Sequence, residues 1–317
     1  MKAQYLTPAV TVFDNNGNVD EKGCCKLYDH LISGGIDGIV IMGSTGEFFE
    51  MTMDEIKRLI DISTSYCKGR TRLLIGTSRM IAEETIELGN YAIEKGADGV
   101  MIISPYYFQL SDESIEYYYD LVCEGIKGDI YLYNYPDITG HQINYDVVLR
   151  LLKKHNNLKG IKDTTALVSH TRDLINNILP EYPDFEIYNG FDENFAYVAL
   201  SGGAGVIGGL SNLIPDIFSK WVKAVNTGDA EGIANGQKII DKAMEIYAIN
   251  KPFIPTMKRA LNIRGIDINE FVKPPFLPIN DKQEEKLRSI MKDIGILWYI
   301  YSLVFEEYLN KAIFLLF

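Results

Sequence analysis

Eight short apolar segments recur along the chain, and this repeat constrains the fold more than any other feature. Each segment reads as a buried strand because it is short, rich in Val and Ile, and bounded by Gly or polar residues. Most begin about 20 to 35 residues after the one before, which leaves room for a helix between them. The expected strands are Ala9–Phe13, Gly38–Met42, Leu73–Gly76, Gly99–Ile103, Ile130–Asn134, Gly160–Lys162, Glu186–Tyr188 and Gly205–Ile207.

The segments between these strands carry the spacing of amphipathic helices. After Thr52, apolar residues recur at Ile56, Leu59 and Ile60, and Thr52 with Glu55 forms the pattern of a capping box. Alternating strands and helices predict parallel strands joined by right-handed crossovers. Eight such units close most economically as a (β/α)8 barrel, the TIM-barrel fold. A doubly wound sheet is the alternative, but no G-x-G-x-x-G follows the first strand, so its dinucleotide-binding form is not indicated.

The C-terminal third is expected to add helices to the barrel and not a second domain. We assign residues 1–225 to the (β/α)8 barrel and residues 226–295 to a C-terminal helical extension of the same domain. Helices are expected there at Ala230–Tyr247 and Pro255–Leu261. Residues 296–317 form an apolar C-terminal tail whose role the sequence does not indicate.

The tail is long enough to suggest a membrane-spanning helix. Glu306, Glu307 and Lys311 stand in its middle, and charged residues there argue against that interpretation. A helix that covers an apolar groove or a subunit contact fits this composition better.

Charge and cysteine content restrict the partners and the compartment. The formal net charge is −12 and the sequence pI is about 4.9, which argues against nucleic acid and anionic membrane surfaces as partners. The four cysteines include no C-x-x-C pair, so neither a zinc site nor a disulfide framework is indicated. Reduced thiols fit a cytoplasmic enzyme, and the first residues do not resemble a signal peptide.

Lys162 is the first candidate for chemistry. It ends the apolar stretch that begins at Leu158, and a lysine at the inner end of a buried strand is costly because desolvation disfavours the ammonium form. A neutral, desolvated amine is the nucleophile that Schiff-base enzymes need. The alternative is that Lys162 is only the first polar residue after a strand and points to water.

Other polar or glycine-rich segments follow the carboxyl ends of predicted strands, where barrels of this type place their active sites. The segment Gly43–Glu47 is either a plain turn or a cradle whose N–H groups and two hydroxyls, on Ser44 and Thr45, bind a carboxylate. Tyr133 is either a core aromatic or a proton shuttle. Tyr107 could simply pack at the rim.

Two further groups of polar side chains are candidates for the site or for a metal. Asp192 and Glu193 either start a helix, as an N-cap and a first-turn acid, or bind sugar hydroxyls. The histidines lack metal-ligand spacing, so we expect them to be structural or solvated and expect no metal site. The four histidines are His30, His141, His155 and His170.

Three segments taken together resemble the dihydrodipicolinate synthase / N-acetylneuraminate lyase family. They are Gly43-Ser44-Thr45-Gly46-Glu47, Tyr133-Asn134-Tyr135-Pro136 and Gly160-Ile161-Lys162-Asp163-Thr164. The resemblance covers nearly the whole chain. It implies a (β/α)8 barrel, a homotetramer, and a class I aldolase that forms a Schiff base with pyruvate and needs no cofactor.

The resemblance also implies roles for single residues. Lys162 would be the Schiff-base lysine, Tyr133 the proton-transferring tyrosine, and Ser44 with Thr45 the carboxylate-binding pair. Tyr107 matches a tyrosine that reaches the neighbouring subunit's site in the synthase branch. The expected catalytic residues are thus Lys162, Tyr133, Ser44 and Tyr107, and the expected substrate contacts are Ser44, Thr45, Ile138, Gly190, Asp192, Glu193, Ile207 and Gly209.

The same segments separate the branches of this family. Ile138 stands where the synthase has an arginine that binds the carboxylate of its aldehyde substrate. Of three candidate activities, the synthase is therefore the third choice. The segment Gly190–Glu193 resembles N-acetylneuraminate lyase, but Gly209 stands where that branch has a serine, so this lyase ranks second. The segments look most like 2-keto-3-deoxy sugar acid aldolases, which predicts reversible cleavage of such an acid to pyruvate and an aldehyde. An inactive barrel that only binds a keto acid is the non-enzyme alternative.

Overall fold

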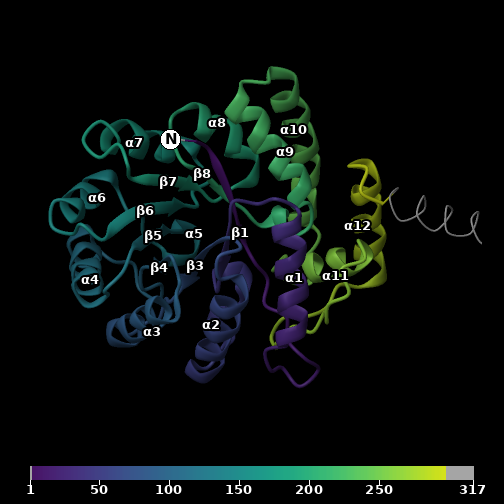
Figure 1. Cartoon of the computed structure of the whole chain (residues 1–317), viewed down its shortest axis with the longest axis horizontal. Coiled ribbons are helices and arrows are strands. Elements are labelled where there is room, and N and C mark those ends of the chain that lie inside the picture. Colours follow the sequence, from purple (N-terminus) through teal and green to yellow (C-terminus); the bar gives the residue numbers. More distant parts are fainter. Residues whose placement is uncertain (1, 298–317) are drawn as a thin grey trace, which may run out of the picture.

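The computed structural model describes residues 2–297, and within them the expected barrel is present. Eight parallel strands pair in sequence order, and β1 pairs with β8 to close the sheet (Figure 1). The TIM-barrel prediction is confirmed. The strands are β1 Gln4–Pro8, β2 Gly38–Ile41, β3 Arg72–Gly76, β4 Gly99–Ile103, β5 Ile130–Asn134, β6 Leu158–Asp163, β7 Glu186–Asn189 and β8 Gly205–Ile207.

Helices surround the strands and supply the crossovers between them (Figure 1). The capping box before α2 is confirmed: the Glu55 N–H donates to Thr52 Oγ1 at 3.3 Å, and the Thr52 N–H donates to Glu55 Oε2 at 2.8 Å. The helices that follow the strands are α1 Glu21–Ser33, α2 Met53–Cys67, α3 Ala82–Lys95, α4 Asp112–Gly125, α5 Pro136–Thr139, α6 Tyr145–Leu152, α7 Val168–Ile178, α8 Phe195–Leu200 and α9 Pro215–Thr227.

The first strand lies earlier than the sequence predicts. The expected strand Ala9–Phe13 is wrong, because β1 spans Gln4–Pro8 and the chain leaves the sheet after Pro8. Ala9, Val10 and Phe13 are nonetheless buried. An apolar run indicates that its residues are buried. Here they are buried because they pack into the hydrophobic core, and not because they belong to a strand. Thr11 Oγ1 donates to the Gly46 carbonyl at 2.6 Å, so this segment supports the loop after β2.

The C-terminal extension packs beside the barrel (Figure 1). It comprises α10 Ala230–Ala243, the short 3-10 turn η5 Met244–Ala248, α11 Ile254–Ile263 and α12 Asp281–Asp293. α10 contacts α9, and α11 contacts α12. The sequence predicts one helix over Ala230–Tyr247, whereas in the structure α10 ends at Ala243 and η5 begins at Met244. From Trp298 onward the apolar tail lies outside the described residues.

A network of polar side chains closes the barrel interior at the amino ends of the strands. Arg72 on β3 forms an ion pair of 2.6 Å with Glu186 on β7 and a short hydrogen bond to Tyr131 on β5. Tyr188 and Gln4 complete this network. It lies at the amino ends of the strands, away from the edge that carries the chemistry in barrels, so we take it as structural.

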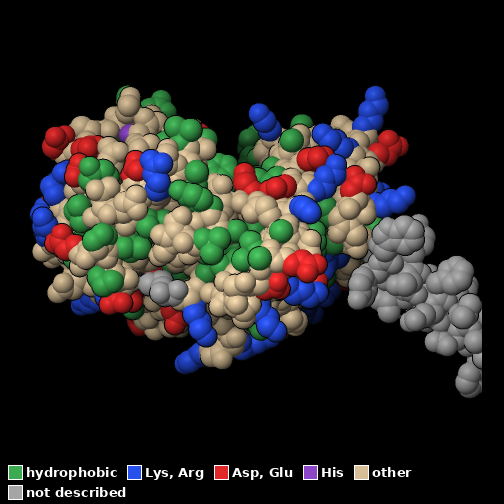
Figure 2. Space-filling model, turned by 90° about the horizontal axis from the view of Figure 1, so that it is seen from above, with side chains coloured by type: hydrophobic (Ala, Val, Ile, Leu, Met, Phe, Trp, Pro, Cys, Tyr) green, Lys and Arg blue, Asp and Glu red, His purple; other side chains and the backbone are tan. Residues whose placement is uncertain are grey.

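On the face shown in Figure 2, acidic and basic side chains are interspersed with apolar ones. No broad basic area stands out on this face of the described chain. Among residues 2–297, no helix has both the length and the apolar character needed to cross a membrane.

Candidate active site

A cavity of about 460 Å³ opens at the carboxyl ends of the strands. Two groups of residues line it, one from the barrel and one from the C-terminal extension. The barrel contributes Pro8, Ser44, Thr45, Phe49, Tyr133, Tyr135, Ile138, Lys162, Thr164, Gly190, Phe191, Asp192, Ile207 and Gly209. The extension contributes Met244, Tyr247, Asn250, Lys251, Pro252, Phe253, Ile254 and Phe276. The cavity thus unites most of the residues that the sequence predicts for the site.

Lys162 and Tyr133 form the centre of the cavity. They are register partners on the neighbouring strands β6 and β5. Lys162 is only 5% exposed, so the alternative that it points to open water does not hold. Its Nζ donates a hydrogen bond of 3.3 Å to the Tyr133 hydroxyl and lies 4.3 Å from the centre of that ring. An amine and a phenol are therefore held side by side in a closed site.

The loop after β2 brings a second hydroxyl to this pair. Ser44 Oγ lies 3.4 Å from the Tyr133 hydroxyl oxygen. Ser44 begins a 3-10 turn, η1 Ser44–Gly46. The Gly46 and Glu47 N–H groups are used inside this turn, on Gly43 O and Ser44 O. In the described chain the N–H groups of Ser44 and Thr45 have no protein acceptor, which leaves them available to an anion.

Non-glycine residues in left-handed conformation flank this loop. Met42 has φ of 58° and Glu47 has φ of 59°. Such conformations are uncommon for side chains of this size and persist only where the surroundings hold them. The backbone of the loop is therefore fixed by contacts from outside the loop.

A buried carboxylate fixes the strand ends behind the central pair. Asp163, directly after Lys162, accepts hydrogen bonds from Asn134 Nδ2 at 2.7 Å and from Thr171 Oγ1 at 2.5 Å. His170 Nδ1 lies 2.9 Å from the same carboxylate, and Thr165 Oγ1 donates at 3.2 Å. Asp163 is fully buried. With donors on β5, on α7 and in the loop between β6 and α7, it holds the backbone that carries Lys162.

Thr164 is a cavity residue that the sequence reasoning missed. Its side-chain hydroxyl is buried and lacks a hydrogen-bond partner among the described residues, although it lines the cavity. A Cβ on Gly190 would overlap this hydroxyl, so the glycine keeps space open for it. Thr164 could have been identified from the sequence, because it ends the segment Gly160–Thr164 that also contains Lys162. The hydroxyl is free to bind a polar group of a ligand.

Gly209 and Ile138 also face the cavity. A Cβ on Gly209 would lie 2.7 Å from the Tyr247 hydroxyl, so a tyrosine from the extension occupies the space that a side chain at position 209 would need. Ile138 lies at the mouth and is half-exposed. Ile207 lies deeper, on β8. None of these three positions offers a charged group to a substrate.

Asp192 lines the cavity, but its carboxylate is engaged inside the protein. It accepts hydrogen bonds from the Tyr5 hydroxyl at 2.5 Å, the Tyr247 hydroxyl at 2.7 Å and the Leu210 N–H at 3.0 Å. Burial raises the pKa of this carboxyl, and the three donors oppose that effect. Phe191, not Asp192, occupies the N-cap of the short 3-10 turn η3 Asp192–Asn194. Glu193 does not line the cavity.

Tyr107 lies outside the cavity. It is 81% exposed, and its ring packs edge-on against Phe108 at a centroid distance of 5.1 Å. Within this single chain it touches neither Lys162 nor Tyr133. Its expected contribution to a neighbouring subunit stays a prediction.

The histidines have structural partners, as expected. His141 Nε2 lies 2.8 Å from Ser104 Oγ, and His155 Nε2 lies 2.7 Å from Asp120 Oδ1. His30 Nε2 lies 3.0 Å from the Asn212 carbonyl. Within residues 2–297, no three or more His, Cys, Asp or Glu side chains gather so that they could hold a metal ion.

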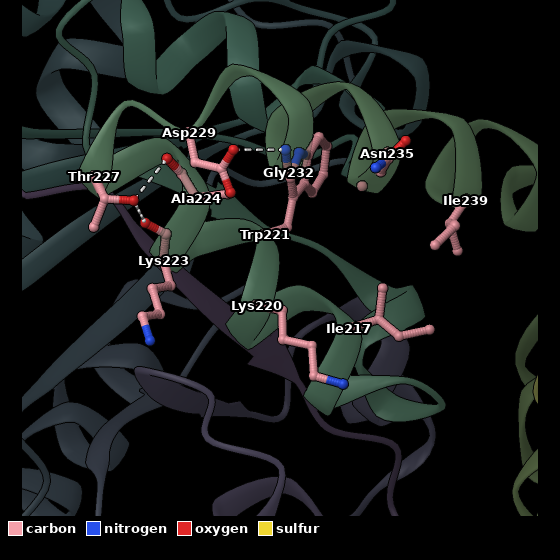
Figure 3. Close-up of a pocket in the computed structure, with 11 residues that line it drawn as sticks. Ile217, Lys220, Trp221, Lys223, Ala224, Thr227, Asp229, Gly232, Asn235 and Ile239 are labelled. Carbon is pink, nitrogen blue, oxygen red and sulfur yellow. Dashed lines mark hydrogen bonds between the residues drawn. The ribbon is translucent and has the colours of Figure 1, made fainter.

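A second hollow of about 470 Å³ lies between α9 and α10, on the outside of the barrel (Figure 3). Asp229 accepts from the Gly232 N–H at 3.0 Å as the N-cap of α10, and Thr227 Oγ1 donates to the Lys223 carbonyl at 2.9 Å. These polar groups serve the helix ends and do not converge on a common point (Figure 3). We assign no chemistry to this hollow.

Comparison with known proteins places this geometry in a family. The dihydrodipicolinate synthetase family matches residues 1–294 of the chain. From Escherichia coli K12, YagE is 30% identical over 92% of this chain and 96% of its own length, and is provisionally named a 2-dehydro-3-deoxy-D-gluconate aldolase. YjhH from the same organism, provisionally named a 2-dehydro-3-deoxy-D-pentonate aldolase, is 30% identical over 92% of this chain and 97% of its own length.

Other relatives carry the synthase name. The 4-hydroxy-tetrahydrodipicolinate synthase of Methanococcus aeolicus is 29% identical over 93% of this chain and 100% of its own length. Among solved structures, that of E. coli YagE in complex with pyruvate has a TM-score of 0.90 and covers 93% of this chain and 99% of its own at 30% identity. The chain belongs to the dihydrodipicolinate synthetase family and is an enzyme of the lyase and aldolase type found in that family.

Proposed function

We propose that this enzyme reversibly cleaves a 2-keto-3-deoxy sugar acid to pyruvate and an aldehyde through a Schiff base on Lys162. The observation that carries the proposal is the buried Lys162 amine, 3.3 Å from the Tyr133 hydroxyl, in a cavity at the strand ends. Borohydride trapping tests it: incubation with pyruvate and borohydride should give a covalent adduct on Lys162. An inactive binding barrel would give none.

Schiff-base formation would begin when the substrate carboxylate rests on the Ser44 and Thr45 N–H groups. The Lys162 amine then attacks the keto carbon, and Tyr133 carries a proton from nitrogen to the former keto oxygen. Tyr133 then donates its own proton to that oxygen, which leaves as water and gives the protonated imine and a Tyr133 phenolate. Ser44 Oγ, 3.4 Å from the Tyr133 oxygen, is placed to accept or return a proton during this exchange.

In the cleavage step the imine serves as the electron sink. Tyr133 takes the proton from the C4 hydroxyl, the C3–C4 bond breaks, and its electron pair passes into the imine to form an enamine. The aldehyde leaves with the former C4 as its carbonyl carbon. Tyr133 passes that proton to C3 of the enamine and regains one from the water that adds to the resulting imine, and collapse of this adduct releases pyruvate and restores the Lys162 amine.

Three observations support a sugar acid as the substrate. Ile138 at the cavity mouth cannot bind a second carboxylate as the synthase arginine would. The free Thr164 hydroxyl suits a hydroxylated carbon beyond the pyruvate half. YagE and YjhH, both 30% identical to this chain, carry names of 2-dehydro-3-deoxy acid aldolases.

The two alternatives receive less support. At Gly209 the Tyr247 hydroxyl fills the position of a substrate-binding side chain, and Asp192 has its acceptors occupied, which disfavours N-acetylneuraminate. Pyruvate release should be measured with 2-keto-3-deoxygluconate, its galacto epimer, N-acetylneuraminate and 4-hydroxy-2-oxoglutarate. Condensation of pyruvate with aspartate semialdehyde should be measured in parallel. Turnover confined to the last reaction would assign the enzyme to the synthases.

We also propose that the enzyme is a homotetramer in which Tyr107 lies in a subunit contact. Tyr107 and its neighbour Phe108 are both largely exposed, an uncommon arrangement for two adjacent aromatic side chains. Sedimentation velocity should give a tetramer, and Tyr107→Asp should shift it toward smaller species. A monomeric wild-type protein would contradict this assembly without affecting the chemistry of Lys162.

A further inference from the structure

Behind the Ser44–Thr45 turn lies a buried ion pair that the proposed chemistry does not use. Glu47 Oε1 and Lys258 Nζ are 2.6 Å apart, and both side chains are 0% exposed. Lys258 Nζ also donates to the Phe271 carbonyl at 3.0 Å and lies 4.9 Å from the centre of the Phe13 ring. Burial raises the pKa of Glu47 and lowers that of Lys258, and the opposite charge of the partner counters each shift.

The pair joins two parts of the chain that line the same cavity. Glu47 ends the turn whose free N–H groups belong to Ser44 and Thr45. Lys258 lies on α11 of the C-terminal extension, whose first residue, Ile254, lines the cavity with the preceding Phe253. A second link runs parallel to the first: Lys273 donates to the Glu50 carbonyl at 3.3 Å and forms an ion pair of 2.5 Å with Glu55.

The backbone of Glu47 explains why such a link is needed. Its φ of 59° puts a non-glycine residue in the left-handed region, where it stays only if its surroundings favour it. This residue is both the C-cap of η1 and the N-cap of the next turn, η2 Phe48–Glu50. The preceding N–H groups are therefore connected to a backbone that needs support, and Lys258 is the charged partner of the Glu47 side chain.

We propose that Glu47 and Lys258 are positioning residues, which hold the Ser44–Thr45 turn in the conformation that binds the pyruvate carboxylate. This inference rests on the proposed function. It gives the C-terminal extension a defined part in the reaction, since α11 supplies the cation that orders a loop of the barrel. The pair acts through the turn and touches no substrate atom.

The test compares two ketones, of which one lacks a carboxylate. Cyanoborohydride trapping on Lys162 is followed by mass spectrometry over a range of pyruvate and, separately, acetone concentrations. The variant Glu47→Gln keeps the shape of the side chain and removes its charge. The half-saturating pyruvate concentration should then rise about tenfold or more, as expected when the N–H groups of the turn lose a charge-assisted contact with the pyruvate carboxylate. Acetone trapping should stay at the wild-type rate, because acetone does not use the turn.

Further variants separate positioning from stability. Glu47→Gln/Lys258→Met removes both charges, so no unpaired charge stays buried, and it should show the same selective loss for pyruvate. Arg259→Met is the matched control: this neighbour on α11 pairs with Glu270 at 2.9 Å and Glu284 at 2.8 Å, away from the turn, and should keep the wild-type ratio of the two ketones.

A merely structural pair would slow trapping of both ketones together, and that result would overturn the inference. Unchanged pyruvate saturation in folded variants would overturn it as well. One measurement needs no variant: in the wild-type enzyme, amide hydrogen exchange in residues 254–263 should slow when pyruvate is trapped on Lys162, and unchanged exchange there counts against the coupling. If wild-type enzyme forms no adduct at all, it is the proposed function that fails.

Discussion

The Asn134 side-chain amide donates a hydrogen bond of 2.7 Å to the Asp163 carboxylate, one residue beyond the Tyr133–Lys162 pair on the same two strands. The two proposed reacting groups and the hydrogen bond that secures their backbone are thus adjacent. The distance between the phenol and the amine is set by strand pairing and reinforced by a buried side-chain contact. This arrangement suits a step in which a proton moves over a short, fixed path.

The substitution Asp163→Asn should loosen this arrangement. The new side-chain amide nitrogen would face donors such as Thr171 Oγ1 and would leave buried hydrogen-bonding groups unsatisfied. The free energy of unfolding should fall by about 1–3 kcal/mol, with a parallel loss of kcat. Urea denaturation measures the first and pyruvate release the second. Asp173→Asn, at a half-exposed position of α7, serves as control, and equal effects of both variants would contradict the role given to Asp163.

Tyr133→Phe isolates the phenol oxygen. The ring remains, so stability should change little, whereas kcat should fall about 10²–10⁴-fold, the usual contribution of general acid–base catalysis. Trapping on Lys162 should still occur, but more slowly. Tyr117→Phe, at an exposed tyrosine of α4, controls for the substitution itself. Near wild-type kcat in Tyr133→Phe would remove the proton-shuttle role.

Thr164→Val tests the substrate half beyond pyruvate. Valine keeps the shape and removes the free hydroxyl, so adduct formation with pyruvate should be unaffected. The value of kcat/KM for cleavage of a hydroxylated keto acid should fall about tenfold, the effect of one lost hydrogen bond. Steady-state kinetics with 2-keto-3-deoxygluconate measures this. A loss in pyruvate trapping instead would show that Thr164 serves the keto-acid half.

Glu50 should make stability depend on pH. Burial, and next the charge of Glu47, raise the pKa of Glu50 to about 7 from its usual 4.5. The folded protein therefore favours protonated Glu50, and this contribution to stability is present below about pH 4.5 and lost as the pH rises through 7. Glu50→Gln should gain in Tm relative to wild type over this range and level off above it.

Thermal melts between pH 4 and pH 8.5 measure the Glu50 effect. Glu94→Gln, at an exposed position of α3, is the control for loss of a carboxylate. A difference in Tm between Glu50→Gln and wild type that stays constant across the series would contradict the prediction.

The barrel could be predicted from the sequence because its strands and helices follow local patterns, whereas the roles proposed for Lys162 and Tyr133 came from the resemblance of their segments to a known family. Strands such as Gly99–Ile103 are continuous apolar runs, and residues at their carboxyl ends, among them Lys162 and Tyr133, must meet at one edge of a closed sheet. The first strand was misplaced because Ala9–Phe13 has the same apolar character without sheet pairing. In a single sequence, a run of apolar residues can indicate either a paired strand or a buried segment outside the sheet.

The outer wall of the cavity could not be predicted in this way. Phe253 and Phe276 reach it only through packing of the extension against the barrel. The loop that carries Asn250 is held from α12, where Gln283 Nε2 donates to the Ile249 carbonyl at 3.0 Å. The engagement of Asp192 by Tyr5 and Tyr247 likewise joins residues far apart in the chain. Such long-range contacts leave no periodic trace in sequence.

Lys162 projects from β6, which is hydrogen-bonded on one side to β5 and on the other to β7. The position of this proposed nucleophile therefore does not depend on the loops around it. Ile138, Asn250 and Lys251, which line the cavity, could therefore be randomised in directed evolution to select for new aldehydes without moving the strand that carries Lys162.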